Sequence, residues 1–179
     1  MSRDMHLSLI GFMGSGKSTV GQAMATRLGR PFLDIDVEVV RMLGMPIPQV
    51  FEELGESAFR EAEQDALSDA LRPNEPIVLA TGGGTPCADG AMEWMRRKSL
   101  VVALAPPLEV LLPRLESSLE TRPLLKGKTG QALAQHIQRM MLTRAACYGQ
   151  ADVTWNQGQW TDDMLDDALA QIRWRLEGP

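Results

Sequence analysis

A glycine-rich segment near the N-terminus constrains this chain more than any other feature. Residues 11–18 read Gly-Phe-Met-Gly-Ser-Gly-Lys-Ser and fit the pattern G-x-x-x-x-G-K-[ST]. The segment follows a short apolar run at 6–10 and precedes a helical pattern at 18–28, which is the setting that this pattern requires. A glycine-rich turn that matches by chance is the alternative. Eight fitting positions in the right setting favour a loop whose backbone N–H groups bind the phosphates of a nucleotide.

Two side chains of this loop have predicted roles. Lys17 is expected to reach the β- and γ-phosphates, and the hydroxyl of Ser18 is expected to ligate Mg²⁺. The motif alone indicates a nucleotide and does not say what is done with it.

The order of apolar runs and helical patterns predicts an α/β fold, in which a parallel sheet is covered by helices on both faces. Short apolar runs that are typical of buried strands occur at 6–10, 32–35, 77–80, 100–104 and 152–155. Helical patterns occupy 18–28 and 58–71, and a third begins after Thr161, which can cap it. Because 179 residues suit one core and no linker or internal repeat is visible, we expect a single domain spanning 1–179.

The charge balance argues against some classes of ligand. The chain has 18 Lys and Arg against 23 Asp and Glu, a net charge of −5, and no run of basic residues. This argues against nucleic-acid binding, so an anionic substrate must be met by a few placed cations. No apolar stretch is long enough to span a bilayer, and the N-terminus does not have the pattern of a signal peptide. We therefore expect a cytoplasmic protein without membrane contacts, in which Cys87 and Cys147 are free thiols.

A polar segment at 116–130 does not have the pattern of a core element. It carries three cations and two glycines. It is either a mobile surface loop or a lid that closes over phosphates and excludes water. The phosphate site elsewhere in the chain favours the lid.

The acids that a phosphate site needs are found at 32–36. Loops of this kind are usually accompanied by an Asp at the end of a second strand, but the run 77–80 is followed by Thr and three glycines. Asp34 and Asp36 end another apolar run, and two residues apart in an extended chain they would point to the same side. We assign Asp34 to the Mg²⁺ shell, through water, and Asp36 to an acceptor hydroxyl as its hydrogen-bond acceptor and base. The alternative is that both begin a solvated turn before a helix.

Two further features concern the acceptor. Arg60 and Glu63 lie three apart on one helical face. They form either an ordinary exposed ion pair or a guanidinium fixed by a carboxylate so that it can grip another carboxylate. Gly82, Gly83 and Gly84 directly follow a buried run, and a tight turn alone would seldom need three glycines. They are typical of a place where the backbone approaches a ligand, at the carboxyl ends of the strands.

In their order and spacing these segments resemble the shikimate kinase family. The resemblance rests on GFMGSGKSTVG, FLDID, GESAFREAE, VLATGGG, TRPLL and RAACY, and it covers most of the chain. It implies a three-layer P-loop kinase fold with a five-stranded parallel sheet. It also implies transfer of the γ-phosphoryl group of ATP to the 3-hydroxyl of shikimate, with Mg²⁺ as cofactor, in aromatic amino-acid biosynthesis. The products are ADP and shikimate 3-phosphate, and we expect a monomer with no partner beyond these small molecules.

The resemblance also implies roles on the nucleotide side. The residues expected to bind the ATP phosphates are Gly14, Ser15, Gly16, Lys17, Ser18 and Thr19, together with Arg122 from the lid. Ser18 and Asp34 are expected at the metal. Catalysis is expected to depend on Asp36, Lys17 and Arg122.

On the acceptor side, the resemblance implies that Asp36 takes the hydroxyls of shikimate. Arg60 and Arg144 are expected to grip its carboxylate. The glycines expected to line the substrate are Gly82, Gly83 and Gly84.

Two places do not fit the pattern. Pro113 falls inside 108–115, where a helix leading to the lid is expected, and proline breaks the hydrogen bonds of a helix. Arg114 is therefore given no role, and no residue near 156–158 is assigned to adenine.

Rival functions come from two classes. Another small-metabolite P-loop kinase, such as a gluconate or nucleoside-monophosphate kinase, should lack two arginines placed for one carboxylate. A nucleotide-dependent switch is the rival of a different class, but the guanine-reading motif Asn-Lys-x-Asp is absent.

Overall fold

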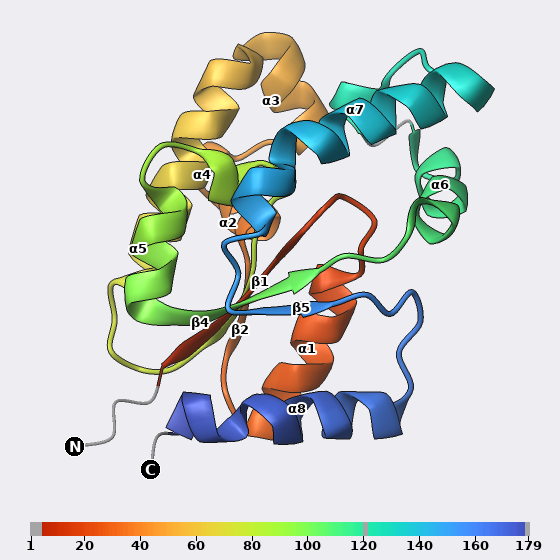
Figure 1. The fold of residues 1–179 in the computed structure, drawn as a ribbon. Helices are drawn as coiled ribbons and strands as arrows, with labels where there is room; N and C mark the ends of the chain where they lie inside the picture. The colour runs from red at the N-terminus through yellow and green to blue at the C-terminus, as the bar shows by residue number, and fades with distance from the viewer. Residues whose placement is uncertain (1–4, 120–121, 178–179) are drawn as a thin grey trace.

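A five-stranded parallel sheet forms the centre of the described part of the chain, residues 5–119 and 122–177 of a computed structural model (Figure 1). The strands are β1 (His6–Gly11), β2 (Phe32–Asp34), β3 (Val78–Ala80), β4 (Ser99–Leu104) and β5 (Val153–Trp155). Their order across the sheet is β2-β3-β1-β4-β5, and each neighbouring pair is parallel. The predicted α/β fold with a parallel sheet is confirmed.

The helices occupy the stretches between and after the strands. They are α1 (Lys17–Leu28), α2 (Ile35–Leu43), α3 (Ile47–Glu53), α4 (Gly55–Leu71), α5 (Ala91–Lys98), α6 (Leu108–Glu116), α7 (Gly130–Tyr148) and α8 (Asp162–Glu177), with short 3₁₀ helices η1 (Thr85–Cys87) and η3 (Pro123–Leu125). Because β1 lies in the middle of the sheet and the chain continues to opposite sides of it, a crevice is expected at its carboxyl end, where ligands bind in such folds.

Apolar side chains are buried on both faces of the sheet. Leu7 and Leu9 of β1 pack into a cluster with α1 and α8, whereas Ile10 packs into a second cluster with α2, α4 and α5. Figure 1 shows α1 and α8 together on one side and α4 and α5 on the other. Residues of a strand alternate between its faces, so a strand buried on both faces is mostly apolar, and the buried Ser8 of β1 is paired by a hydrogen bond to Ser99 at 2.8 Å.

A third, smaller cluster carries the segment predicted to be a lid. Leu111 and Leu115 of α6, Leu125 of η3, and Leu133 and Ile137 of α7 pack together, and Phe12 of the loop after β1 packs against them. This contact places η3 and α7 over the glycine-rich loop. Glu120 and Thr121 of the predicted lid lie outside the described residues.

Caps define the ends of two predicted helices. Helix α1 begins after Gly16, which has φ of +94°, and ends at Gly29, whose left-handed backbone lets its N–H bond the last turn. The Thr161 hydroxyl accepts a hydrogen bond from Met164 N at 3.3 Å and so caps α8. The predicted end of the first helix at Leu28 and the predicted start of the last helix after Thr161 are confirmed, and α1 begins at Lys17, one residue before the expected start.

Two local predictions were wrong. The strand expected at 32–35 ends at Asp34, because the Asp34 side chain accepts a hydrogen bond from Asp36 N and starts α2 at Ile35. Helix α6 also runs through Pro113. Proline removes one helical hydrogen bond there, to Glu109, and both residues lie on the exposed side of the helix, where the loss is tolerated.

None of the helices in the described part of the chain combines the length and apolar character that crossing a bilayer requires.

Candidate active site

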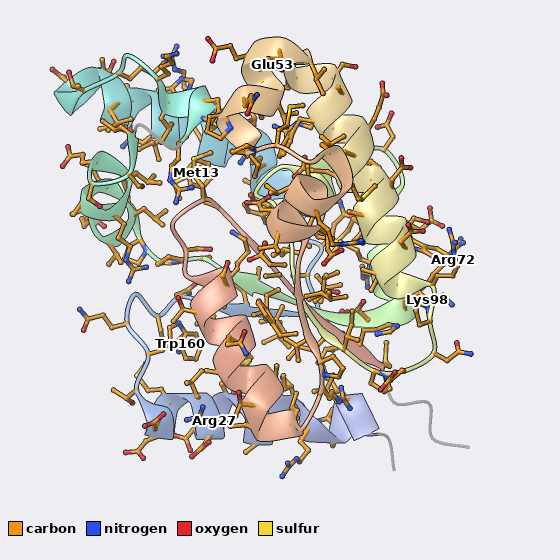
Figure 2. The ribbon with its side chains drawn as sticks, turned by 180° about the vertical axis from the view of Figure 1, so that it is seen from behind. Met13, Arg27, Glu53, Arg72, Lys98 and Trp160 are labelled. Atoms are coloured by element: carbon orange, nitrogen blue, oxygen red, sulfur yellow. A yellow bond between two sulfur atoms is a disulfide. The ribbon has the colours of Figure 1, made fainter. Side chains whose placement is uncertain are left out.

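The loop between β1 and α1 has the backbone that a phosphate cradle needs. Gly11, Gly14 and Gly16 all have positive φ, at +147°, +77° and +94°. A Cβ at Gly11 would also collide with the carbonyl of Leu104 on the neighbouring strand. Only glycine takes up this course without strain, so the loop can turn its N–H groups inward beside the N-terminus of α1. Figure 2 labels Met13 on this loop.

Lys17 lies under the loop, 8% exposed. Its ammonium group donates to the carbonyls of Gly11 and Phe12, each at 2.9 Å, and to Ser15 Oγ at 3.4 Å. Burial lowers the pKa of Lys17 to about 8, although Asp36 and Asp34 act in the opposite direction. A cation is thus held at the base of the cradle, where it lines the cavity.

Ser18 and Asp34 meet at the mouth of the cradle. Ser18 Oγ donates to Asp34 Oδ2 at 2.5 Å, and Asp34 Oδ1 accepts from Asp36 N at 3.0 Å. Within residues 5–119 and 122–177, no group of three or more His, Cys, Asp or Glu side chains is arranged to hold a metal. A hydroxyl beside one carboxylate does fit Mg²⁺, which keeps several waters and is commonly bound by one or two carboxylates together with substrate phosphates.

Asp36 lies in the first turn of α2. Asp34 and Asp36 therefore do not lie on one side of an extended strand, and that prediction was wrong. Both side chains still line the same cavity, because Asp34 caps α2 and Asp36 lies in the first turn of that helix. Asp36 is accessible to water from this cavity, but the surrounding protein weakens its solvation. This desolvation, with Asp34 and Glu63 nearby, raises the pKa of Asp36 to about 6, against the opposing influence of Lys17 and Arg122.

The cradle opens into a cavity of about 430 Å³, within the range of small-molecule sites. The charged and hydroxyl side chains that it brings together are Ser15, Lys17, Ser18, Thr19, Asp34, Asp36, Thr81, Arg114 and Arg122. Gly14, Ser15, Gly16, Lys17, Ser18 and Thr19 therefore all line one space, as the sequence predicts. Trp160, labelled in Figure 2 on the segment leading into α8, lines the same cavity.

A second, smaller cavity of about 100 Å³ adjoins the first. The residues that border both are Met13, Asp36, Gly83 and Arg122. The residues that line only the second are Arg60, Arg144, Gly82 and Gly84, together with the apolar side chains of Ile47, Phe51, Phe59 and Leu124. The wall of this space holds both cations and apolar side chains, and Asp36 lies where it meets the phosphate cradle.

Arg60 is held from two sides on α4. Its Nη1 donates to Glu63 Oε2 at 2.5 Å, and its Nη2 donates to Glu56 Oε1 at 2.9 Å. Burial by itself would lower the pKa of Arg60, but the two glutamates outweigh it and raise the pKa. The Glu63 side chain is only 1% exposed, so the interpretation as an ordinary exposed ion pair applies to Glu56 and not to Glu63.

Arg144 lies across the cavity on α7. Its Nη1 is buried without a hydrogen-bond partner in the described part of the chain, and its guanidinium carbon lies 5.3 Å from the centre of the Phe12 ring. A buried guanidinium N–H is costly when unpaired, so an anionic group in this cavity would satisfy it.

The triple glycine packs against these charged side chains. A Cβ at Gly84 would lie 2.8 Å from Arg60 Nη1, and one at Gly83 would lie 3.1 Å from Arg144 Nη1. A Cβ at Gly82 would collide with Glu63. The glycines therefore line the cavity, as expected, and also leave the room that the arginines and Glu63 occupy.

Two further arginines line the larger cavity: Arg122, from the predicted lid, and Arg114, from α6. Arg122 Nε donates to Ser118 Oγ at 2.9 Å, and burial lowers its pKa while Asp36 opposes that effect. Arg114, given no role from the sequence, donates to the carbonyls of Gly14, at 3.0 Å, and of Gly158. The sequence could have indicated Arg114 through its place in the helix before the predicted lid. That interpretation would have required Pro113 to be tolerated on the exposed side of the helix.

Sequence reasoning also missed Tyr148. Its hydroxyl donates to the carbonyl of Gly83 at 2.5 Å, and burial raises the pKa of this phenol. Tyr148 follows Arg144 by four residues, one helical turn, so helix spacing could have placed both on the same face.

The two cysteines form a disulfide, so the prediction of two free thiols was wrong for this structure. Cys87 of η1 is joined to Cys147 of α7, with Cα atoms 5.5 Å apart and a separation of 60 positions in the sequence. Two cysteines at such a separation carry no pairing signal of their own. The fold brings them together, because η1 follows the glycines and α7 packs beside it.

Known proteins of one family match most of the chain. The family model for shikimate kinase matches residues 13–173. A shikimate kinase of Aquifex aeolicus is 40% identical over 168 residues, which cover 94% of this chain and 96% of that protein. A solved structure of shikimate kinase from Acinetobacter baumannii in complex with shikimate superposes with a TM-score of 0.83 at 33% identity, covering 96% of this chain and 92% of that one.

A more distant likeness concerns the fold alone. A gluconokinase from Sinorhizobium meliloti superposes with a TM-score of 0.59 at 17% identity, covering 99% of this chain and 96% of that one. This chain shares the P-loop kinase fold with both solved structures, but clear sequence similarity only with the shikimate kinase. The chain belongs to the shikimate kinase family.

Proposed function

We propose that this protein transfers the γ-phosphoryl group of ATP to the 3-hydroxyl of shikimate and releases ADP and shikimate 3-phosphate. The observation that carries the proposal is the pair of guanidinium groups, Arg60 and Arg144, which line one small cavity that meets a phosphate cradle at Asp36. A carboxylate bound to both arginines would satisfy the buried Nη1 of Arg144. A ring hydroxyl of the same molecule would then face Asp36 and the cradle.

On the nucleotide side, the loop holds the phosphates and two cations stabilise the charge that moves. The residues proposed to bind phosphate are Gly14, Ser15, Gly16, Lys17, Ser18, Thr19 and Arg122. Lys17 and Arg122 offset negative charge on the transferring group, and cations that are already fixed in place need no reorganisation when they do so. Mg²⁺, when bound, neutralises charge on the phosphate oxygens, and Ser18 and Asp34 are the residues that would hold it.

On the acceptor side, Asp36 accepts the proton of the 3-hydroxyl as that oxygen forms its bond to the γ-phosphorus. The bond between this phosphorus and the bridging oxygen breaks on the opposite side, and ADP leaves. With a pKa of about 6, Asp36 is mostly ionised at pH 7 and still basic enough to take part in the transfer. Arg60 and Arg144 fix the carboxylate, and Gly82, Gly83 and Gly84 leave room for the ring, so the hydroxyl is held in line.

Further proposals concern the whole chain. We propose that 116–130 acts as a lid over a single domain, and that closure excludes water, the competing acceptor. We propose a monomer that acts in the cytoplasm on small molecules, without nucleic-acid or membrane partners. In a reducing cytoplasm the Cys87–Cys147 pair would be open to reduction.

The test is a coupled assay of ADP release with purified protein, Mg·ATP and shikimate. ADP release that depends on shikimate is expected, with gluconate and nucleoside monophosphates giving no more than the rate without acceptor. Turnover with gluconate and none with shikimate would favour the rival kinase. Hydrolysis that no acceptor stimulates would favour a nucleotide-dependent switch.

A further inference from the structure

Thr85 lies directly behind the triple glycine, and the proposed function gives it no role. It is the first residue of η1 and is completely buried. Its hydroxyl donates to Glu63 Oε1 at 2.6 Å. Thr85 is not among the described residues that line either of the two adjoining cavities. Its hydroxyl can therefore act on substrates only indirectly, and the side chain to which it donates is Glu63.

Glu63 connects Thr85 to Arg60. One oxygen of its carboxylate accepts from Thr85, and the other accepts from Arg60 Nη1 at 2.5 Å. The other partner of Arg60, Glu56, is 54% exposed, and an exposed pair of this kind contributes little to holding a side chain. The buried hydrogen bond to Glu63 therefore sets the orientation of the Arg60 guanidinium.

The Glu63 carboxylate has little freedom to take another position. It is buried beneath Gly82, where an added Cβ would collide with its Oε1 and lie 2.7 Å from Thr85 Oγ1. A buried carboxylate is stable only when its oxygens accept hydrogen bonds. Loss of the Thr85 donor would leave Oε1 without this bond and free the carboxylate to shift. Such a shift weakens its hold on Arg60.

Thr85 is itself fixed in place. Its carbonyl accepts from Gln64 Nε2 at 3.4 Å, on α4, and from Ala88 N at 3.3 Å, at the end of η1. The hydroxyl thus belongs to a rigid turn and not to a mobile loop, which is what a group that orients another side chain requires.

We propose that Thr85 is a positioning residue, whose hydroxyl holds Glu63 so that Arg60 points at the carboxylate of the acceptor. The proposal rests on the proposed function, since it concerns affinity for shikimate. The hydrogen bonds of Thr85 and Glu63 lead to Arg60, which is proposed to bind the acceptor, and not to the loop proposed to bind phosphate. Removal of the hydroxyl should therefore change KM for shikimate much more than kcat.

The first experiment compares three variants with the wild-type protein. Thr85→Val removes the donor and keeps the shape, Thr85→Ser keeps the donor, and Thr26→Val removes an exposed hydroxyl on α1 that bonds only its own helix. We expect Thr85→Val to raise KM for shikimate roughly tenfold, with kcat and KM for ATP within about twofold of wild type. Thr85→Ser and Thr26→Val should stay within about twofold throughout. A serine variant as weak as the valine variant would overturn the proposal.

A double-mutant cycle then tests the route through Arg60. Arg60→Ala alone should raise KM for shikimate strongly, and Thr85→Val added to it should change kcat/KM by less than about twofold, since the guanidinium that Glu63 holds is gone. An equal loss in both backgrounds would show a general structural effect and overturn the proposal. If Thr85→Val does not fold, as judged by its thermal transition, the same cycle is measured with Thr85→Ala.

Measurement of the wild-type protein in the same assay distinguishes failure of the proposed function from failure of the proposed role of Thr85. No shikimate-dependent ADP release from the wild type would refute the proposed function. Wild-type turnover with an unchanged KM in Thr85→Val would refute only the role of Thr85.

Discussion

Ser18 donates its hydroxyl hydrogen to Asp34 across 2.5 Å, and this bond joins the first turn of α1 to the end of β2. Asp34 in turn accepts from the backbone N–H of Asp36. One carboxylate therefore connects the hydroxyl proposed to ligate Mg²⁺ with the helix turn that carries the proposed base. Two hydrogen bonds thus connect Ser18, a proposed metal ligand, with the turn that carries Asp36.

Asp34→Asn tests the metal side of this connection. Asparagine caps a helix about as well as aspartate, so α2 should be retained and the thermal transition should stay close to that of wild type. The lost charge should raise the Mg²⁺ concentration for half-maximal activity about 10–100-fold. The measurement is a Mg²⁺ titration at fixed ATP, with Glu38→Gln, on the same helix, as the control. An unchanged Mg²⁺ requirement in Asp34→Asn would remove Asp34 from the metal site.

Asp36→Asn tests the base. The variant keeps the size of the side chain and cannot take the proton of the hydroxyl, so kcat should fall about 10²–10⁴-fold. ATP affinity, measured by titration of the variant with nucleotide, should stay within about twofold. Near-normal turnover would show that Asp36 has no part in the chemistry.

The pH dependence follows from the two shifted groups. The pKa of Asp36 is raised to about 6, so its reactive carboxylate is lost as the pH falls through 6, and kcat/KM for shikimate should fall on the acid side. The pKa of Lys17 is lowered to about 8, so its charge is lost as the pH rises through 8, and kcat/KM for ATP should fall on the alkaline side. The profiles are measured from pH 5 to 9.5. An acid limb that persists unchanged in the residual activity of Asp36→Asn would contradict the assignment.

Ionisation of Asp36 is expected to favour activity but to lower the stability of the fold. Because its pKa in the folded protein lies above the ordinary value of 3.8, the folded state binds the proton more tightly than the unfolded state between about pH 4 and 6. This group therefore destabilises the fold when it is ionised, above pH 6. Chemical denaturation at pH 7.5 should show Asp36→Asn to be no less stable than wild type, and a clear loss of stability would contradict the sign.

Reduction of the Cys87–Cys147 disulfide should weaken the packing of α7 against η1, beside the cavity proposed to bind shikimate. The bond joins η1 to α7, which carries Arg144, and it closes a loop of 60 residues. Its loss should cost about 2–4 kcal/mol, seen as a fall of roughly 5–15 °C in Tm with reductant, and should raise KM for shikimate. Cys87→Ser/Cys147→Ser is the matched control, because its Tm and KM should not respond to reductant. Two titratable thiols in the native, unreduced protein would refute the pairing.

The parts of the site that could be predicted are those with a local cause. Glycines at fixed offsets before Lys17 and Ser18 determine the course of one loop, and the apolar run before them determines the strand. Thr161 and Gly29 act on the helix turn beside them. Such features depend on neighbours in the sequence, so the sequence contains them.

The parts that could not be predicted depend on contacts across the fold. In the sequence, Ile35 and Asp36 look like a continuation of the strand, because only the fold shows that the Asp34 side chain caps α2. Pro113 looks like a helix break until its exposed position in α6 is known. Cys87 meets Cys147, and Thr85 meets Glu63, only because α4, η1 and α7 pack around the same glycines. The role of Arg114 has the same origin, since the carbonyls it binds belong to two distant loops.

The most direct test is a crystal structure of the protein with shikimate, Mg²⁺ and a non-hydrolysable ATP analogue. We expect the shikimate carboxylate between Arg60 and Arg144, its 3-hydroxyl within hydrogen-bond distance of Asp36, and the γ-phosphate in the glycine-rich loop. Shikimate bound elsewhere, or with its carboxylate turned away from both arginines, would contradict the account.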